Sequence, residues 1–437
     1  MADGRLNVKD FSSIAVKPYR DGAIWSKAFS AALSKNKKLY IPTGRYYIDK
    51  SVVLRSGADI LADKDAEIIL IKGVKTLLLR NESVADGSTG RIAETHKRDE
   101  KISIEGGIWA EENDERLGYG ASGAFDEEDS FHGVSTCFLF SCVKHLRLEN
   151  LTFRHTAGFA VQIGEIDGFE IKNIVFDGCF ADGLHINGNT VNGVIENLSG
   201  HTEDDLIALN AYDWDNSSIN FGRIENLVVD GVYAAGGENA HKSMRIQPGI
   251  YPYEDGTTED CYIKNLRIKN VVGAATFKMY LQTPAYTDRP EKPVGVGRIE
   301  NISFENISAD TREPVDRQPN YLNCDPVTGN FATFEVGSNV NGINFRNVRV
   351  LLDKRKYPNA YFMTVGPKSQ YIKEKGLELF DPYIDCVLSG MTYEDVYING
   401  EYVEDISPFV KEINFGNIYP SALPFGRGVI ENNKELK

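Results

Sequence analysis

A short phrase recurs along this chain: an apolar residue, any residue, asparagine, an apolar residue, any residue and another apolar residue. Its asparagine stands at positions 150, 173, 197, 226, 265, 301 and 347, so the separations are 23, 24, 29, 39, 36 and 46 residues. Self-similarity at a nearly fixed period indicates a solenoid, in which each coil buries its apolar face only against its neighbours. We therefore predict coils of about 23 residues, with insertions that lengthen the later ones.

The residues around these asparagines alternate between apolar and polar, which is typical of strands. Leu146-Arg147-Leu148 and Leu151-Thr152-Phe153 are two examples. An asparagine amide at the bend between two strands can bond its equivalents one coil above and below, which satisfies the polar groups of the turn. We assign the asparagines to structure and not to catalysis.

Length and charge limit the possible partners. The 437 residues would suggest two or three domains by length alone, but the repetition favours one domain over 1–437. A net charge of -15 and a pI near 5.1 argue against nucleic acid as a partner. The same charge weakens the case for a strongly anionic polymer as substrate.

Cysteine usage and hydropathy narrow the class further. The six cysteines (137, 142, 179, 261, 324 and 386) lack the paired spacing of a metal site and are too sparse for a disulfide framework, so we predict free buried thiols. No run of about 18 apolar residues predicts a membrane span, and polar residues rather than a signal peptide follow Met1. The location stays open between the cytoplasm and secretion with the leader removed.

The N-terminal segment joins a helical pattern to a strand-like one. Residues 38–48 read Lys-Leu-Tyr-Ile-Pro-Thr-Gly-Arg-Tyr-Tyr-Ile, and a helical apolar stripe precedes them at Ile24, Trp25, Ala28, Phe29 and Ala32. A short amphipathic helix that covers the open end of a β-stack needs such a stripe. The segment resembles the N-terminal cap of pectate-lyase-like right-handed parallel β-helices. The resemblance implies an all-β right-handed parallel β-helix whose capping helix lies within residues 1–50.

Two stretches break the repeat. The segment 81–134 carries acid clusters at 111–115 and 126–129, for which we predict solvated loops. Residues 353–437 are predicted to form the C-terminal coils and cap, with a last strand-like group at Val410, Ile413 and Phe415.

Four segments between Ala181 and Gln282 align as successive coils. They read Ala-Asp-Gly-Leu-His-Ile-Asn, Asp-Asp-Leu-Ile-Ala-Leu-Asn, Lys-Ser-Met-Arg-Ile-Gln and Phe-Lys-Met-Tyr-Leu-Gln, and they begin at Ala181, Asp204, Lys242 and Phe277. Superposing their terminal apolar-amide pairs puts Asp182 over Asp205. It also puts His185 over Ala208, Arg245 and Tyr280, and Glu335 of a later coil falls on the same register. The alignment therefore gathers acids, a histidine and cations in one patch.

Three aspartates in this patch suit acid and base catalysis. Asp204 and Asp205 are neighbours just before a strand, so their side chains can serve one site only if the chain bends there. Asp182 precedes Asp205 by 23 residues (205 minus 182), which is one coil. Carboxylates held roughly 5 Å apart repel, so that one keeps a proton while another stays ionised. That division is what a general acid and a general base require.

These residues resemble the family 28 glycoside hydrolases, the polygalacturonase group. The family carries Asn-Thr-Asp-Gly, Gly-Asp-Asp-Cys-Ile-Ala and Gly-His-Gly where this chain has Asp182-Gly183, residues 204–209 and Ala240-His241. Carried over, Asp204 protonates the leaving oxygen, and Asp205 with Asp182 activates water for inversion. The resemblance implies no cofactor and no metal, and it covers about 100 residues at the site.

The chain also departs from that pattern. Glu203 replaces the glycine before the acid pair, and Lys242 replaces the one after the histidine, so that either His241 or Lys242 faces the cleft. The family's Arg-x-Lys group, which binds sugar carboxylates, has no counterpart; Phe277-Lys278-Met279 stands there instead, with Arg245 one coil earlier. Galacturonic acid is therefore a less favoured substrate than another glycoside.

Further residues complete the predicted carbohydrate site. The substrate-binding candidates are His185, His241, Lys242, Arg245, Lys278, Tyr280, Tyr212 and Trp214. Tyr212 and Trp214 lie in the insertion after the acid pair, where we expect exposed rings that stack on sugars. His201 is expected to be a turn residue.

Two other functions remain open. A polysaccharide lyase on the same fold would use Lys278, Arg245 or Lys242 as a base and acidic residues to hold calcium. A glycan-binding or tailspike-type module would present the same long surface without chemistry. The aspartate cluster favours a glycoside hydrolase with a carbohydrate as its partner, and the oligomeric state stays open.

Overall fold

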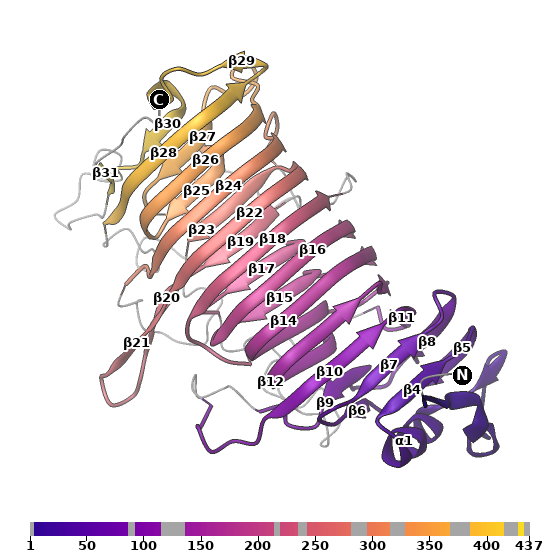
Figure 1. Cartoon of the computed structure of the whole chain (residues 1–437). Coiled ribbons are helices and arrows are strands. Elements are labelled where there is room, and N and C mark those ends of the chain that lie inside the picture. The colour runs from indigo at the N-terminus through magenta and orange to yellow at the C-terminus, as the bar shows by residue number, and fades with distance from the viewer. Residues whose placement is uncertain are drawn as a thin grey trace. The chain divides into compact units, whose positions relative to one another are not determined.

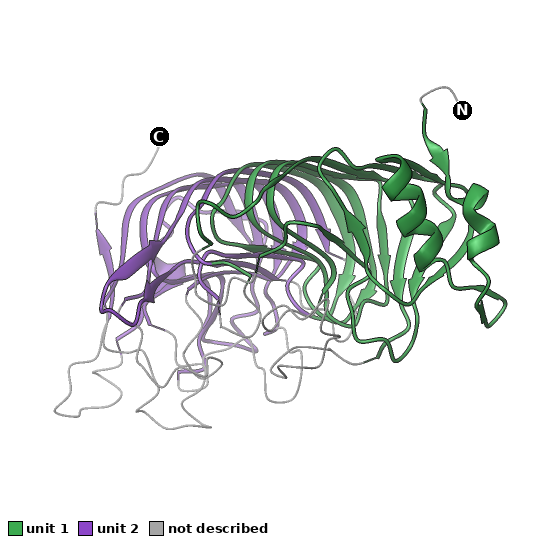
Figure 2. Cartoon of the chain, turned by 90° about the horizontal axis from the view of Figure 1, so that it is seen from below, with its two compact units in different colours: residues 1–203, 216–220 green, residues 204–215, 221–437 purple. Residues whose placement is uncertain are grey.

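The computed structural model describes residues 4–85, 92–114, 136–213, 219–234, 243–280, 295–314, 328–367, 385–414 and 427–431. Its contacts divide the chain into two compact units, coloured green and purple in Figure 2. Unit 1 comprises Met1–Glu203 and Asn216–Asn220, and unit 2 comprises Asp204–Asp215 and Phe221–Lys437. The single domain over 1–437 stays a prediction.

Unit 1 begins with short elements and continues with long strands. In chain order these are β1 (Leu6–Asn7), η1 (Val8–Ile14), β2 (Pro18–Tyr19), β3 (Gly22–Ala23), α1 (Ser26–Lys35), β4 (Lys38–Ile41), β5 (Gly44–Ile48), β6 (Val52–Leu54), β7 (Asp59–Ala62), β8 (Ala66–Leu70), β9 (Leu79–Asn81), β10 (Asp99–Glu105), β11 (Ile108–Glu111), β12 (Thr136–Glu149), β13 (Thr152–Arg154), β14 (Phe159–Cys179), β15 (Leu184–Asn187) and β16 (Thr190–Thr202).

The strands of unit 1 form three parallel stacks. One runs β4–β7–β10–β12–β14–β16, a second β5–β8–β11–β13–β14–β16 and a third β6–β9–β12–β14–β15. The long strands β12 and β14 turn a corner and so belong to more than one stack. Apolar side chains lie directly above one another along a stack, as in the buried column Ile60, Ile104, Leu148, Ile171 and Ile195. Each coil thus buries its apolar face against the next.

Unit 2 repeats this construction with longer coils. Its elements are β17 (Ile207–Asn210), β18 (Ile224–Ala234), β19 (Ser243–Gln247), β20 (Gly249–Pro252), β21 (Thr258–Cys261), β22 (Ile263–Ala274), β23 (Thr276–Tyr280), β24 (Arg298–Asp310), β25 (Phe331–Gly337), β26 (Asn339–Leu351), β27 (Ala360–Val365), β28 (Cys386–Ile398), β29 (Glu401–Tyr402), η5 (Ser407–Phe409), β30 (Val410–Glu412) and β31 (Gly428–Glu431).

Two parallel stacks organise unit 2. They run β18–β22–β24–β26–β28–β31 and β17–β19–β23–β25–β27–β30, while β20 and β21 form an antiparallel hairpin. Phenylalanines fill the interior, with Phe277 stacked on Phe334 at 5.0 Å and Phe304 on Phe345 at 5.5 Å. Figure 1 shows the strands of each unit as successive arrows. The predicted all-β right-handed parallel β-helix is confirmed.

Asparagine ladders mark the corners of both units. In unit 1, Asn173 donates to Asn150 at 2.9 Å, and Asn197 donates to Asn173 at 3.1 Å. In unit 2, a similar ladder joins residues 226, 265 and 301 at 2.9 and 3.2 Å. All six asparagines adopt the left-handed backbone, with φ between 55° and 60°. Asparagine is suited to that conformation because its short amide bonds locally, so the structural assignment of these residues is confirmed.

Asn347 does not continue the ladder of Asn301, as its place in the repeat had suggested. It donates instead to Asn306 at 2.8 Å, so one coil here is 41 residues (347 minus 306) and not 46. Ile302 pairs with Ile343, so Gly342 occupies the position of Asn301 in the next coil. Its φ is 81°, which is also left-handed. Asn301 and Asn306 stand at two different corners, and both adopt the left-handed backbone. The recurring sequence phrase does not distinguish one corner from the other.

The N-terminal helix lies where its apolar stripe predicts. Helix α1 buries Ala28, Phe29 and Ala32 and packs on β4 and β6, and Ile24 forms a bridge with Tyr47 just before it. Its role as a cap stays a prediction. Among the described residues, no helix has the length and apolar character needed to cross a membrane.

The segments between the coils differ in part from the expectations. Glu111 lies in β11 and accepts the backbone N–H of Ala157 at 2.8 Å, so the acid run that it begins is not wholly a solvated loop. Residues 115–135, which include the second acid cluster, lie outside the described part, as do Phe415 and Cys324. The five described cysteines are buried, as predicted, and Cys137, Cys142, Cys179 and Cys261 are free thiols.

Candidate functional site

In unit 2, the stack β17–β19–β23–β25 carries charged side chains on one face. Alternation along each strand sends Met244, Phe277 and Phe334 into the core and places their neighbours on the opposite face. The opposite face reads Ala208, Arg245, Lys278 and Glu335 in successive strands, because these residues pair in register. These four residues are themselves largely removed from solvent, since each of them is buried.

The register corrects part of the sequence alignment. Arg245 pairs with Lys278 and not with Tyr280, so the last segment was aligned two residues out of place. Glu335 does lie on the row of Ala208 and Arg245, as predicted. The sequence alignment matches Leu281-Gln282 to Ile246-Gln247, whereas the strand register pairs Met244 with Phe277 and Arg245 with Lys278.

Asp205 precedes β17 and contacts two cations of this row. It is 1% exposed, Arg245 donates Nε to its Oδ2 at 2.6 Å, and Lys278 donates Nζ to its Oδ1 at 3.3 Å. Ser243 donates its hydroxyl to Oδ1 as well. Two cations and a hydroxyl therefore stabilise the ionised form of a carboxylate that burial alone would disfavour.

Lys278 responds to the same burial. Removal from water lowers its pKa from the ordinary range, and the negative charge of Asp205 opposes that shift. Arg245 lowers the pKa further, while Asp204 and Glu335 raise it. The acidic neighbours thus favour the charged ammonium form of Lys278, whereas burial favours the neutral amine.

Asp204 differs from its neighbour in exposure. The chain bends at Glu203 and Asp204 before β17 begins, as the adjacent acid pair requires. Asp204 is only partly buried, and its Oδ1 accepts the backbone N–H of Asp205 at 3.1 Å. One carboxylate of the pair is therefore accessible, and the other is enclosed by donors.

Unit 1 holds Asp182 in a different network. Its Oδ2 lies 2.7 Å from Nδ1 of His185, and both side chains are buried. Nε2 of His185 lies 3.3 Å from the amide nitrogen of Asn187, and the ring stacks on Phe159 at 4.0 Å. The histidine ring is thus held by contacts on both nitrogens and on one face.

The hydrogen bonds of Asn187 define the histidine tautomer. Its Oδ1 accepts Nε2–H of Gln162 at 2.8 Å and the backbone N–H of Ile219 at 3.3 Å, so its NH₂ group faces His185. An amide NH₂ only donates, and Nε2 of His185 must accept. We assign the ring proton to Nδ1, from which it is donated to Asp182. His185 therefore orients the carboxylate of Asp182.

The remaining predicted site residues divide into two groups. Tyr212 is 8% exposed and packs on Phe221 and Tyr251, at 5.5 and 6.0 Å between ring centroids, so it is not the exposed stacking ring that the sequence suggested. Tyr280 is buried at the end of β23. His241, Lys242 and Trp214 lie outside the described residues. His201 lies in β16 rather than in a turn.

Sequence reasoning missed Ser243, Gln162 and the role of Asn187. Ser243 precedes Arg245 by two residues on the same strand and hence shares its face, so alternation counted back from Arg245 would have found it. Gln162 pairs with His185 one coil away, but no local pattern distinguishes it from other polar strand residues.

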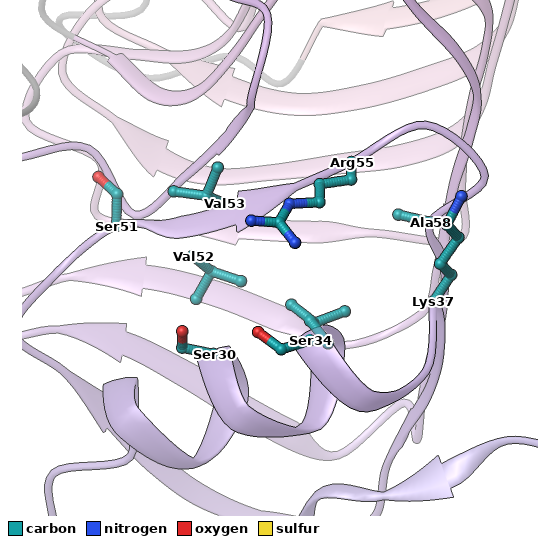
Figure 3. A pocket seen from close by; sticks show the side chains of 9 residues that line it. Ser30, Ser34, Lys37, Ser51, Val52, Val53, Arg55 and Ala58 are labelled. Atoms are coloured by element: carbon teal, nitrogen blue, oxygen red, sulfur yellow. The ribbon is translucent and has the colours of Figure 1, made fainter.

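A separate pocket of about 100 Å³ lies between α1 and β6 in unit 1. Figure 3 shows Arg55 and the hydroxyls of Ser30 and Ser34 around it, with Lys37 at one end. No carboxylate lines this pocket, so it offers no acid and base pair of the kind found near β17.

Comparisons with known proteins add structural likeness only. No family model matches the chain, and no curated protein matches it. The surface adhesin PfbA of Streptococcus pneumoniae is 14% identical with a TM-score of 0.46, over 90% of this chain and 89% of the adhesin. A Yersinia enterocolitica family 28 exopolygalacturonase is 11% identical with a TM-score of 0.42, over 93% and 77%. The catalytic domain of a family 87 α-1,3-glucanase gives 14% and 0.39, over 90% and 67%. Functional roles for this chain therefore rest on its own residues.

Proposed function

We propose that the protein is a glycoside hydrolase that inverts the anomeric centre. The observation that carries the proposal is the unequal acid pair, with Asp204 partly exposed beside a buried Asp205 that two cations keep ionised. Acid and base catalysis at one bond needs one carboxyl group that gives a proton and another that takes one.

In this mechanism Asp204 gives its proton to the glycosidic oxygen as that bond breaks. Asp205 takes a proton from water, and the water oxygen bonds to the anomeric carbon. We assign the acceptor role to Asp205 because the two cations beside it keep its carboxylate ionised. Asp182, one 23-residue coil earlier in the sequence, shares the water in our proposal, and His185 orients it.

The binding roles follow from the same row. Arg245 and Lys278 stabilise Asp205 in our proposal instead of contacting the sugar directly, which differs from the substrate-binding role that the sequence suggested. His241, Lys242 and Tyr280 remain proposed sugar contacts.

The test is hydrolysis of a panel of plant and microbial oligosaccharides, followed by detection of new reducing ends. We expect Asp204→Asn to lower the rate by about 10²-fold or more, because the proton donor is lost. Asp260→Asn, at an exposed ion pair with Arg298, is the matched control and should keep the rate. Circular dichroism of both variants checks folding. Equal turnover by Asp204→Asn and the unaltered protein would remove Asp204 from its role.

A second candidate function is a polysaccharide lyase. One observation favours it: burial lowers the pKa of Lys278, and a neutral amine can act as a base. A lyase releases an unsaturated sugar that absorbs ultraviolet light, and a calcium-dependent one loses activity with a chelator. Such a product from the panel would replace the hydrolase proposal.

A further inference from the structure

The charges around Asp205 bear on the kind of sugar that the site accepts. Among the described residues of unit 2, the row and the acid pair contribute three carboxylates, Asp204, Asp205 and Glu335, and two cations, Arg245 and Lys278. With all five ionised, the local charge is -1 (2 minus 3). A proton on Asp204, as the proposed mechanism requires, brings this charge to zero and leaves no excess of positive charge for an anionic ligand.

Both cations also have a partner inside the protein. Arg245 lies 2.6 Å and Lys278 lies 3.3 Å from Asp205, and Glu335 pairs in register with Lys278. A sugar carboxylate could attract either cation only by weakening its hold on Asp205. The buried Asp205 would then lose the compensation that keeps it ionised.

The position at which the family's Arg-x-Lys group would begin carries no charge in this chain. Thr276 stands two residues before Lys278, and its hydroxyl donates to the backbone oxygen of Ala332 at 2.9 Å. A buried threonine with that partner cannot neutralise a carboxylate. The whole chain, at a net charge of -15, also repels an anionic polymer as it approaches.

We propose that the site takes a neutral glycan, one without carboxylate, sulfate or phosphate groups on its sugars. This inference rests on the proposed function and names its substrate class. It also separates the two candidate reactions. Elimination by a lyase removes a proton beside a sugar carboxylate, and a neutral sugar lacks the group that makes this proton acidic. Hydrolysis needs only the glycosidic bond and water.

The experiment compares neutral oligosaccharides with the same backbones oxidised at C6 to uronates. Binding to Asp204→Asn is measured by titration calorimetry, and hydrolysis by the unaltered protein is measured in parallel. We expect each neutral ligand to bind roughly tenfold more tightly than its oxidised counterpart or better. Raising sodium chloride from about 0.05 M to about 0.5 M should leave neutral binding unchanged and improve uronate binding, because salt screens the repulsion.

A charge variant sharpens the comparison. Glu335→Gln removes one negative charge from the row and should narrow the difference between neutral and oxidised ligands by a few-fold. Glu300→Gln, a carboxylate of unit 2 that pairs with the partly exposed Lys264, is the matched control and should leave the difference unchanged.

The outcomes separate this inference from the proposed function. Tighter binding of uronates, or uronate affinity that falls with salt, overturns the neutral substrate and leaves hydrolysis standing if new reducing ends appear. Neutral glycans that bind without being cleaved keep the substrate class and overturn the hydrolase. An unsaturated product from uronates overturns both, and so does a panel in which nothing binds.

Discussion

The two units stabilise their buried carboxyl groups in different ways. In unit 2, Asp205 is matched by Arg245 and Lys278. In unit 1, Asp182 accepts a hydrogen bond from His185, and Glu111 accepts one from a backbone N–H. Burial raises the pKa of Glu111 to about 7, so near neutrality it is partly protonated. The difference teaches that unit 2 holds a fixed charge by ion pairing, whereas unit 1 relies on hydrogen bonds and protonation.

The largest expected effect comes from removing the fixed charge of unit 2. Asp205→Ala leaves two cations in a buried site, and we expect it to lower the free energy of unfolding by about 3–5 kcal/mol. Glu305→Ala is the matched control, because Glu305 also pairs with two arginines, Arg267 and Arg346, that are half exposed. It should cost about 1 kcal/mol or less. Urea denaturation measures both, and equal losses would contradict the special role of burial.

The next effect concerns pH and Glu111. Its pKa is about 7 in the folded protein and about 4.3 when unfolded, so the folded state binds more protons between these values. Stability is therefore greatest below about pH 4.3, as far as this group is concerned, and falls as pH rises through 7. A pKa unit is worth about 1.4 kcal/mol, and partial exposure of Glu111 reduces the total to roughly 2 kcal/mol.

Glu111→Gln should remove this contribution to the pH dependence. Unfolding midpoints of the variant and the unaltered protein, measured at several pH values from 4 to 8, report it as a difference in slope. Glu100→Gln on β10 is the control, since that side chain is exposed. If both variants keep the slope of the unaltered protein, protonation of Glu111 does not stabilise unit 1.

A smaller effect is expected at Asp182. His185→Phe keeps the stacking on Phe159 but removes the Nδ1–H donor to a buried carboxylate, which should cost about 1–2 kcal/mol. Asp182→Asn keeps an oxygen that accepts from His185 and should cost less. Thermal unfolding distinguishes the two, and the reverse order would mean that the charge of Asp182 matters more than its hydrogen bond.

The sequence predicted the fold better than the site, for physical reasons. Corner residues such as Asn173 and Asn265 need a left-handed backbone, which few residues tolerate, so their identity is visible in the repeat. The alternation of buried and more exposed side chains in β10 and in the second half of β12 is also visible in the sequence. The pairing of Arg245 with Lys278 depends on the register between coils of unequal length. In the sequence alone, Tyr280 is an equally good partner for Arg245. The donation from Ser243 to Asp205 joins residues 38 apart and needs the fold before it can be recognised.

The smallest effect tests whether the corners are shaped by backbone conformation or by the amide ladder. Asn265 has φ of 55°, donates to Asn226 and accepts from Asn301. Asn265→Ala puts a poorly suited residue at a left-handed position and removes both bonds, so we expect a loss of about 1 kcal/mol. Asn265→Gly removes the same bonds but suits the conformation, as Gly342 shows in register with Asn301. If conformation dominates, glycine recovers most of the stability that alanine loses in urea denaturation. If the two variants lose equally, the exposed amide ladder itself holds the corner, and unit 2 then depends on side-chain hydrogen bonds at its surface, whereas those around Asp182 in unit 1 are buried.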